Sequence, residues 1–414
     1  MKILFLAHRI PYPPNKGDKI RSFNELRALA ACGHEVHLRA FADDLGDLEY
    51  QFELLRWCAS VEIVPLRRGP AWLGAGLALA TGRSLSVGYY ASRRMRGSVK
   101  RVMAEQEFDA VLVYSSTMAQ YVPPEFNSRT VIDLVDIDSE KWRIYAGRAS
   151  PPRSWVYRLD WRRLRRHEYE IVSRFAYSVV TTDREAALLD ELDEFTRRAR
   201  LRTITNGVDL EEFQPGERIP ATPRLVFVGA MDYFANVEGV RWFVEEVLPL
   251  VRMREPQAEF FIVGGKPTEE VLRLGRSDGV KVTGYVRDIR PYLESATVCV
   301  VPLRIARGVQ NKVLEAMAAG RAIVATSEAV AGLRVTHGEE LLVADTPHLF
   351  ADAVLELIRN LELRRRLGEE ARLFVEREHD WAPLLQKLVG LIETVGARPR
   401  ASRRPGSRTL SGSL

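Results

Sequence analysis

Short apolar runs alternate with helical patterns along nearly the whole chain, and this alternation restricts the possible folds more than any other feature. The runs are apolar throughout, which is typical of parallel strands buried on both faces. They lie at residues 2–7, 35–41, 60–65, 109–113, 130–135 and 177–181, and again at 224–229, 258–263, 279–283, 297–301 and 321–326. Helical patterns lie between them, for example at 19–32, 237–253, 309–319 and 346–360. The sequence therefore predicts an α/β protein with doubly wound sheets.

A stretch rich in proline and polar residues divides the two series of strands. Residues 212–223 read EFQPGERIPATP, which is typical of a linker, and the next segment restarts a sheet. We therefore expect two Rossmann-like domains, over 1–210 and 211–379, with a ligand cleft between them at the carboxyl ends of the strands. A last helix, about residues 380–395, is expected to pack back on the first domain.

The net charge of +5 is distributed unevenly, because 60 lysines and arginines face 55 acidic residues over the whole chain. Residues 397–414 hold five arginines and no acid, so the remainder is neutral. We expect this basic tail to be disordered. Within the neutral part, residues 63–104 contain eight basic residues and no acidic one. A patch of one sign indicates a surface that meets a partner.

Cysteine content and hydropathy exclude several classes of protein. Cys32, Cys58 and Cys299 are scattered without the spacing of metal ligands, which favours a reducing compartment. No apolar run reaches the about 18–20 residues of a membrane-spanning helix. The start of the chain is better explained as a buried strand than as a signal peptide. We therefore expect a cytoplasmic protein.

The strongest functional signal follows the strand at 297–301. A polar loop with two arginines leads to a glycine that opens a helix, which then carries an asparagine, a lysine and a glutamate. These residues are Arg304, Arg307, Gly308, Asn311, Lys312 and Glu315. A helix N-terminus at a strand's carboxyl end is a phosphate site, where arginines can hold a diphosphate through paired hydrogen bonds. The carboxylate can accept hydrogen bonds from two ribose hydroxyls. Taken alone, Glu315 is better explained as a helix-surface carboxylate paired with Lys312, and Gly308 and Asn311 could simply start and cap the helix.

Three motifs together resemble the retaining nucleotide-sugar glycosyltransferases of family 4. They are RGVQNKVLEAMA at 307–318, Asn206-Gly207-Val208-Asp209 and Val263-Gly264-Gly265. The resemblance covers nearly the whole chain and is densest over 204–345. It implies the GT-B fold, with two Rossmann-like domains facing each other across a cleft, and sugar transfer with retention. Together with MDYFANVEGVRWF at 231–243, the first motif resembles sugar transferases associated with exosortase/PEP-CTERM polysaccharide systems.

The family's pair of glutamates, separated by seven residues, is only half present. Glu315 fills the second position, which implies that it holds the donor's ribose, whereas Arg307 stands in the first. Either Arg307 contacts the diphosphate or an acidic sugar, or the sugar is recognised elsewhere. The loop 229–239 also lacks the arginine and lysine that relatives often have there. We hypothesise that Arg304, Arg307 and Lys312 supply the missing charge. The predicted donor site also includes Asn311, Gly308, Gly229, Gly264 and Gly265.

A glycine loop after the first strand is the candidate site for the diphosphate and the acceptor. It reads PYPPNKGD at 11–18, and Gly17 permits close approach of the backbone to a ligand. The resemblance implies that Lys16, Gly17 and Asp18 lie over the diphosphate, although many relatives have two glycines here. A proline-rich turn with Asp18 as the cap of the next helix is the alternative.

Asp136, after the strand at 130–135, stands where many relatives carry a histidine near the reacting centre. A carboxylate there could take the proton of the acceptor hydroxyl or orient the sugar, and we name Asp136 and Arg307 as candidate catalytic residues. Capping of the next helix is the alternative for Asp136. A metal site with Asp138 and Glu140 is disfavoured, because the resemblance implies charge stabilisation by basic residues and helix dipoles. We expect no metal and no cofactor.

A helix predicted over 151–175 indicates a surface that contacts a membrane. Arg158, Arg162, Arg165 and Arg166 flank a stripe of mainly apolar residues at helical spacing. Together with the acid-free segment, these arginines would meet anionic headgroups while aromatic side chains insert. The alternative is a core-facing helix with a solvated basic face. No nucleic-acid fold signature accompanies the arginines, so we expect no nucleic-acid partner.

The leading prediction is a hexosyltransferase-type glycosyltransferase of cell-surface or exopolysaccharide biosynthesis. Its partners would be a nucleotide sugar, a glycan or polyprenyl-linked acceptor, and the inner face of the plasma membrane as a peripheral docking surface. Two alternatives remain: a GT-B nucleotide-sugar epimerase, and a non-catalytic scaffold that binds sugar nucleotides or membrane.

Overall fold

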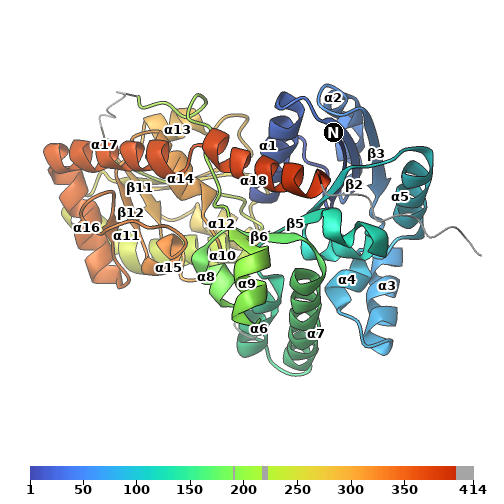
Figure 1. The fold of residues 1–414 in the computed structure, drawn as a ribbon. Coiled ribbons are helices and arrows are strands. Elements are labelled where there is room, and N and C mark those ends of the chain that lie inside the picture. The colour runs from blue at the N-terminus through green and yellow to red at the C-terminus, as the bar shows by residue number, and fades with distance from the viewer. Residues whose placement is uncertain (190–191, 217–221, 398–414) are drawn as a thin grey trace, which may run out of the picture.

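Two parallel sheets form the framework of the molecule (Figure 1). The computed structural model describes residues 1–189, 192–216 and 222–397. The first sheet has the order β3-β2-β1-β4-β5-β6-β7 and the second the order β10-β9-β8-β11-β12-β13. Each order reverses once, next to β1 and next to β8, as in doubly wound folds. The prediction of two doubly wound sheets is therefore confirmed.

The strands of the first sheet are β1 (Lys2–Ala7), β2 (Glu35–Ala42), β3 (Ser60–Pro65), β4 (Ala110–Tyr114), β5 (Thr130–Val135), β6 (Tyr177–Val180) and β7 (Leu201–Thr203). Those of the second are β8 (Arg224–Val228), β9 (Glu259–Val263), β10 (Val280–Gly284), β11 (Val298–Val301), β12 (Ile323–Ala325) and β13 (Leu342–Val343). Sequence analysis missed β7 and β13, because β7 reads Leu-Arg-Thr and β13 has only two residues, so neither presents an apolar run.

Helices cover both faces of each sheet (Figure 1). In the first half they are α1 (Gly17–Ala31), α2 (Gln51–Leu54), α3 (Arg68–Ala80), α4 (Leu85–Tyr89), α5 (Arg93–Glu105), α6 (Asp138–Arg148), α7 (Arg153–Arg174), α8 (Asp183–Ala187) and α9 (Glu194–Arg200). In the second half they are α10 (Phe234–Trp242), α11 (Leu248–Arg254), α12 (Glu269–Leu274), α13 (Arg290–Glu294), α14 (Asn311–Ala318), α15 (Ser327–Val330), α16 (Pro347–Arg359), α17 (Leu361–Glu378) and α18 (Trp381–Gly396). The helix expected over 237–253 is α10 and α11 joined by a π-helical turn, Phe243–Val247.

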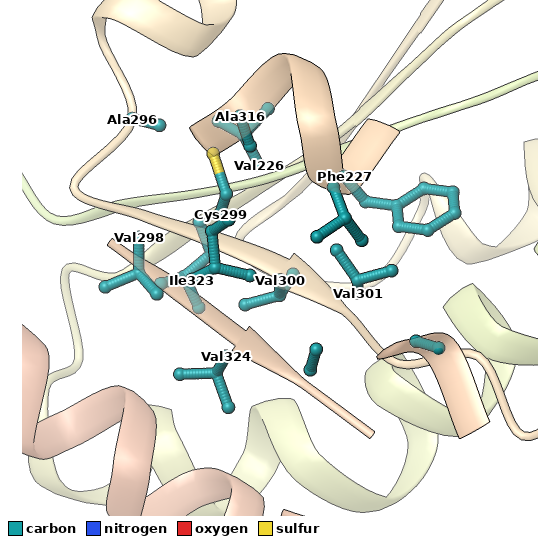
Figure 2. Packing of buried hydrophobic residues seen from close by; sticks show 14 of the residues in the cluster. Val226, Phe227, Ala296, Val298, Cys299, Val300, Val301, Ala316, Ile323 and Val324 are labelled. Atoms are coloured by element: carbon teal, nitrogen blue, oxygen red, sulfur yellow. The ribbon is translucent and has the colours of Figure 1, made fainter. Parts of the chain in front are cut away.

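The core of the second domain lies between its sheet and the surrounding helices. Figure 2 shows Cys299 and Val300 of β11 beside Ile323 and Val324 of β12, with Ala316 of α14 above them. All five side chains are buried, which fits strands covered on both faces. This packing fixes α14 at the carboxyl end of β11.

The last helix, α18, returns to the first domain. Its apolar face, from Trp381 to Val395, joins the cluster that covers one face of the first sheet. The two chain crossings between the domains lie side by side: the Val208 N–H donates to the His379 carbonyl at 2.8 Å. A Cβ on Gly207 would overlap the Trp381 ring, so only glycine permits this close crossing.

Two segments of the predicted layout lie outside the described residues. The tail predicted to be disordered is described only at Ala397, which ends α18. Within the linker expected at 212–223, residues 217–221 are not described. None of the helices in the described ranges combines the length and hydropathy needed to cross a bilayer.

Candidate functional site

The N-termini of two helices from different domains meet in the cleft. Helix α1 begins at Gly17 and α14 begins at Asn311, and a Cβ on Gly17 would lie 3.6 Å from the Asn311 amide nitrogen. Asn206 donates to the Asn311 side-chain oxygen at 3.1 Å, which links the two domains here. Since helix N-termini carry partial positive charge and free N–H groups, their convergence suits an anion such as a diphosphate.

Gly308 does not open the helix, contrary to the sequence prediction. Its φ of 58° is incompatible with a right-handed helix, so α14 begins at Asn311 with Gln310 as its N-cap. A Cβ on Gly308 would overlap the Asp136 carboxylate of the first domain. Gly308 is therefore a loop residue that lets the two domains approach closely.

Lys312 and Glu315 lie one turn apart on α14, and both are half-buried. The Lys312 ammonium donates to the Asn236 side-chain oxygen at 2.6 Å and lies 4.6 Å from the Phe227 ring centre. It therefore does not form the ion pair with Glu315 that the alternative interpretation required. Burial lowers the pKa of Lys312 to about 7, and burial likewise raises the pKa of Glu315 to about 7. Among the described residues, the Glu315 carboxylate has no hydrogen-bond partner.

The glycines of the predicted donor site differ in what they do. Gly264 has φ 148°, and a Cβ there would overlap the Gly229 carbonyl, so the ends of β8 and β9 pack backbone against backbone. A Cβ on Gly229 would lie 2.7 Å from the Asn236 amide and 3.2 Å from the Lys312 ammonium. Gly264 thus lets the two strand ends meet, and Gly229 makes room for the side chains of α10 and α14. Gly265 has only ordinary contacts, with Tyr285.

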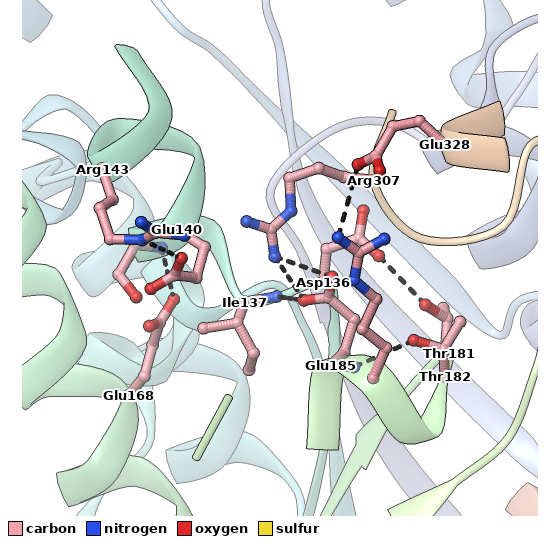
Figure 3. Close-up of polar contacts among 12 residues, drawn as sticks. Asp136, Ile137, Glu140, Arg143, Glu168, Thr181, Thr182, Glu185, Arg307 and Glu328 are labelled. Atoms are coloured by element: carbon pink, nitrogen blue, oxygen red, sulfur yellow. Dashed lines mark hydrogen bonds and ion pairs between the residues drawn. The ribbon is translucent and has the colours of Figure 1, made fainter. Parts of the chain in front are cut away.

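Asp136 lies in a cluster of charged residues between the domains (Figure 3). The strand before it ends at Val135 with φ 65°, a conformation that Asp133 stabilises by accepting the Val135 N–H at 2.7 Å. Asp136 accepts from the Thr181 hydroxyl at 3.0 Å. It does not cap the next helix, because α6 begins at Asp138 after Ile137 without a side-chain cap.

Burial raises the pKa of Asp136 to about 7, and the carboxylates of Glu185 and Asp138 act in the same direction. The Thr181 hydrogen bond and Arg307 oppose the shift. Asp136 is therefore an acid whose charge changes near neutral pH. That property suits a group that accepts a proton during a reaction.

Both arginines of the loop after β11 contact carboxylates. Arg307 donates to both oxygens of Glu185 in the first domain, at 2.7 and 2.8 Å. Arg304 lies apart from this contact, half-exposed over Trp242 and 3.3 Å from Glu238. Each contact engages one guanidinium nitrogen, Nη2 of Arg307 and Nη1 of Arg304, so the hypothesis that both arginines face a diphosphate relies on their other N–H donors.

The loop at 16–18 also differs from its alternative interpretation. Lys16 is the N-cap of α1 and Asp18 lies in the first turn, so Asp18 is not the cap. Its carboxylate pairs with Arg9 and lies 3.5 Å from the His8 imidazole. Hydrogen bonding by His8 and the Arg9 charge hold the pKa of Asp18 well below its usual range, although burial opposes them. Gly17 lies at the cleft, whereas Asp18 is committed to the first domain.

Helix α7, which was predicted to contact a membrane, differs from the prediction in the exposure of its side chains. The stripe on α7 faces inward: Leu164, Glu168 and Ile171 are buried, and Glu168 accepts the Ser139 N–H of α6 at 3.1 Å. Arg165 is half-buried against Tyr169, which corrects its assignment to the membrane surface. Arg158, Arg162 and Arg166 are exposed. Helical spacing revealed the stripe but not which partner it faces.

Sequence analysis missed three polar residues of this site. Glu185 pairs with Arg307, Asn236 with Lys312, and Asn206 with Asn311. Asn206 belongs to a motif that the sequence analysis used only for the resemblance, so its site was within reach. Asn236 likewise lies in the motif at 231–243, although its partner is 76 residues away. Glu185 carries no local signal, and its partner is 122 residues away. Within the described ranges, no three His, Cys, Asp or Glu side chains are arranged to hold a metal ion.

Comparisons with known proteins agree with this geometry. Residues 222–360 match the family described as glycosyl transferases group 1. An uncharacterized 44.6 kDa protein in the cps region of Klebsiella pneumoniae is 19% identical over 394 residues, which cover 92% of this chain and 96% of that protein. The D-inositol 3-phosphate glycosyltransferase of Corynebacterium urealyticum is 25% identical over 274 residues, 59% of this chain and 62% of the relative.

Solved structures share the arrangement of both domains. Sucrose-phosphate synthase from Thermosynechococcus elongatus superposes with a TM-score of 0.70 at 18% identity, covering 95% of this chain and 99% of that one. Anabaena HepE in complex with UDP and glucose superposes with a TM-score of 0.66 at 15% identity, covering 95% and 100%. The predicted GT-B fold is therefore confirmed.

Proposed function

We propose that the chain is a glycosyltransferase that takes a sugar from a nucleotide-diphosphate donor and passes it to a glycan or lipid-linked glycan. The observation that carries this proposal is the placement of Glu315 and Lys312 beside the converging N-termini of α14 and α1. That arrangement lies within the segment matched by glycosyl transferases group 1. Transfer of a hexose with retention, without metal or cofactor, is the finer form of the proposal and rests on the family resemblance.

The charges of the cleft suit a departing nucleoside diphosphate. The N-termini of α1 and α14 would stabilise its negative charge. Because burial lowers the pKa of Lys312 to about 7, this side chain would take up a proton beside the diphosphate. Glu315, which lacks a partner among the described residues, would accept hydrogen bonds from the ribose hydroxyls. Asp136 would receive the acceptor's proton or orient the sugar.

The relative in a cps region supports a place in surface polysaccharide synthesis. A role in the exosortase-associated systems rests on the family resemblance alone. Such a role is compatible with a cytoplasmic enzyme that uses a polyprenyl-linked acceptor. The epimerase and the scaffold remain alternatives, and each predicts a different outcome when donor and acceptor are supplied together.

A panel of nucleotide sugars tests the proposal directly. Calorimetric titration of the full chain with UDP-, GDP-, ADP-, dTDP- and CMP-linked sugars is expected to show saturable binding of at least one. Incubation with that donor and a polyprenyl-linked glycan should yield an elongated glycan whose new anomeric centre keeps the donor's configuration. Binding of none would contradict the transferase, an isomerised donor would favour the epimerase, and binding without turnover the scaffold.

We also propose a membrane contact on α3 and the start of α7, which lie in the two segments predicted to form it. Exposed apolar side chains gather on α3 and at the start of α7: Trp72, Leu73, Leu77 and Trp155. The two helices are linked by Arg163, which donates to the Leu79 carbonyl at 2.9 Å. Exposed arginines lie on α7, Arg158 and Arg162 among them. Apolar and basic side chains without acids between residues 63 and 104 suit an anionic bilayer.

Replacing Trp72, Leu73 and Leu77 together by serine is expected to weaken binding to phosphatidylglycerol vesicles at least tenfold, because all three side chains would insert into the interface. Vesicle flotation of the full chain measures the bound fraction. Phe52→Ser provides the control, since Phe52 is 78% exposed on α2. Equal flotation of both variants would contradict this docking surface.

A further inference from the structure

Three consecutive residues of α8 connect the two domains through ion pairs. The pairs are Asp183–Arg334 at 2.5 Å, Arg184–Glu328 at 3.5 Å and Glu185–Arg307 at 2.7 Å. The side chains of the first two pairs are exposed, so solvent and salt screen them. The Glu185 and Arg307 side chains are only 3% and 17% exposed. The third pair is therefore the one whose loss would leave a buried charge without a partner.

Glu185 is fixed on the first domain independently of Arg307. Its backbone N–H donates to the Thr182 hydroxyl at 3.0 Å, at the start of α8. Its carboxylate accepts the Ile137 N–H at 2.6 Å, one residue after Asp136. Glu185 thus holds the Arg307 guanidinium beside Asp136, as Figure 3 shows.

Several charged groups from both domains face Asp136. Asp138 of α6 and Glu185 of α8 are acidic and come from the first domain. Arg307 is the cation that the second domain contributes, and Tyr233, before α10, is the other titratable group of that domain within range. The balance of negative and positive charge around Asp136 therefore depends on Arg307 remaining in place.

Lys141 and His8 act on the neighbouring Asp138. Burial raises the pKa of Asp138, and these two groups and Arg307 oppose that shift. Opening of the cleft would remove Arg307 with the second domain while Lys141 and His8 stay behind. The cation at Asp136 is thus supplied only when the domains are together.

We propose that Glu185 is a positioning residue which, through Arg307, links closure of the two domains to the charge of Asp136. This inference rests on the proposed function for its catalytic meaning, because Asp136 is the candidate proton acceptor there. Closure brings Arg307 to the carboxylates and removes water from Asp136. Opening returns Asp136 to water and leaves Glu185 without its partner.

The direction of the pH dependence follows from the two states of Asp136. The pKa of Asp136 is about 7 in the closed arrangement, where burial is the largest influence on it. In an opened cleft its pKa is lower, since Gly308 of the second domain no longer covers the carboxylate. It stays above the value of about 3.9 for an aspartate in water, because Glu185 and Asp138 remain and Arg307 leaves. The closed state therefore binds the proton more tightly, so protonation favours closure. Closure loses stability as the pH rises between the pKa values of the open and closed states, and the loss is complete above the higher one.

Small-angle X-ray scattering of the ligand-free full chain between pH 5 and 9 tests the link. We expect the radius of gyration to rise with pH. In Glu185→Gln the midpoint should fall by about one pH unit, since one carboxylate is removed and Arg307 becomes available to Asp136. In Asp136→Asn the pH dependence should disappear, and this variant serves equally if Glu185→Gln does not fold.

Asp183→Asn is the matched control, because it removes an inter-domain ion pair at a nearby, exposed position of the same helix. Its midpoint should equal that of the unaltered protein. A radius that does not change with pH, or equal midpoints in Glu185→Gln and Asp183→Asn, would overturn the inference. Scattering needs no substrate, so a chain that binds no nucleotide sugar yet opens with pH contradicts the proposed function alone.

Discussion

Replacing Glu315 by alanine is expected to lower the affinity for the nucleotide-sugar donor at least a hundredfold. The Glu315 carboxylate lies half-buried beside the N-terminal half of α14 and has no hydrogen-bond partner among the described residues. Two hydrogen bonds from ribose hydroxyls to a charged acceptor contribute about 1.5–3 kcal/mol each, which corresponds to a factor of about a hundred or more. Calorimetric titration with the preferred donor measures the loss.

The same substitution should leave the fold intact and raise its stability at alkaline pH. Burial raises the pKa of Glu315 to about 7, above the ordinary value of about 4.3 for a glutamate. Keeping Glu315 ionised in the folded protein therefore lowers the free energy of unfolding, by an amount that grows as the pH rises between those values. Alanine removes this loss. Glu356→Ala, on the exposed face of α16, is the control. Donor binding by Glu315→Ala at unchanged affinity would exclude the ribose contact.

Gly308→Ala is expected to reduce kcat/KM at least a hundredfold while the melting temperature falls only slightly. A Cβ on Gly308 would overlap the Asp136 carboxylate, and Gly332 packs against the Gly308 carbonyl from the other side. The loop therefore cannot move away without separating the domains. Gly308 and Asp136 face each other across the cleft and not within a hydrophobic core. The added methyl group should therefore hinder closure of the domains more than it lowers the free energy of unfolding.

Gly338→Ala is the control that separates backbone strain from overlap with Asp136 as the cause of the lost activity. Gly338 also has a positive φ, of 84°, but a Cβ added there would meet nothing within 4 Å. The control thus keeps the backbone strain of about 1–2 kcal/mol and lacks the overlap with Asp136. Steady-state kinetics on both variants, with thermal unfolding alongside, gives the comparison. If Gly338→Ala loses as much activity as Gly308→Ala, closeness to Asp136 is not the reason.

The accuracy of the sequence predictions depended on how local each interaction is. Strands such as β1, β3 and β5 were predicted at their observed bounds because burial on both faces produces unbroken apolar runs. The start of α14 was predicted three residues early, since the left-handed conformation of Gly308 depends on the facing domain. A glycine before a helical pattern does not reveal that dependence.

The same distinction applies to the site. Lys312 and Glu315 were recognisable because their helix and the strand before it are contiguous in sequence. The partner of Arg307 was not, since Glu185 reaches it only after both sheets have formed and faced each other. The outward face of α3, with Trp72 and Leu73, differs from Glu185 in this respect, because it lies in the acid-free segment that the sequence had already marked as a candidate membrane surface. The structure adds that both side chains are exposed.

The return of α18 to the first sheet has a consequence for biosynthesis. The cluster on one face of that sheet includes Trp381, Leu384, Leu388 and Ile392, which are among the last residues of the folded part to be translated. The first domain, although made first, cannot complete this face until the second domain has left the ribosome. Helix α1 covers part of this face early, through Phe23, Leu26 and Leu29 of the same cluster. The rest of the apolar face lacks its cover through most of the synthesis of the chain, and surface exposed in this way is prone to aggregation.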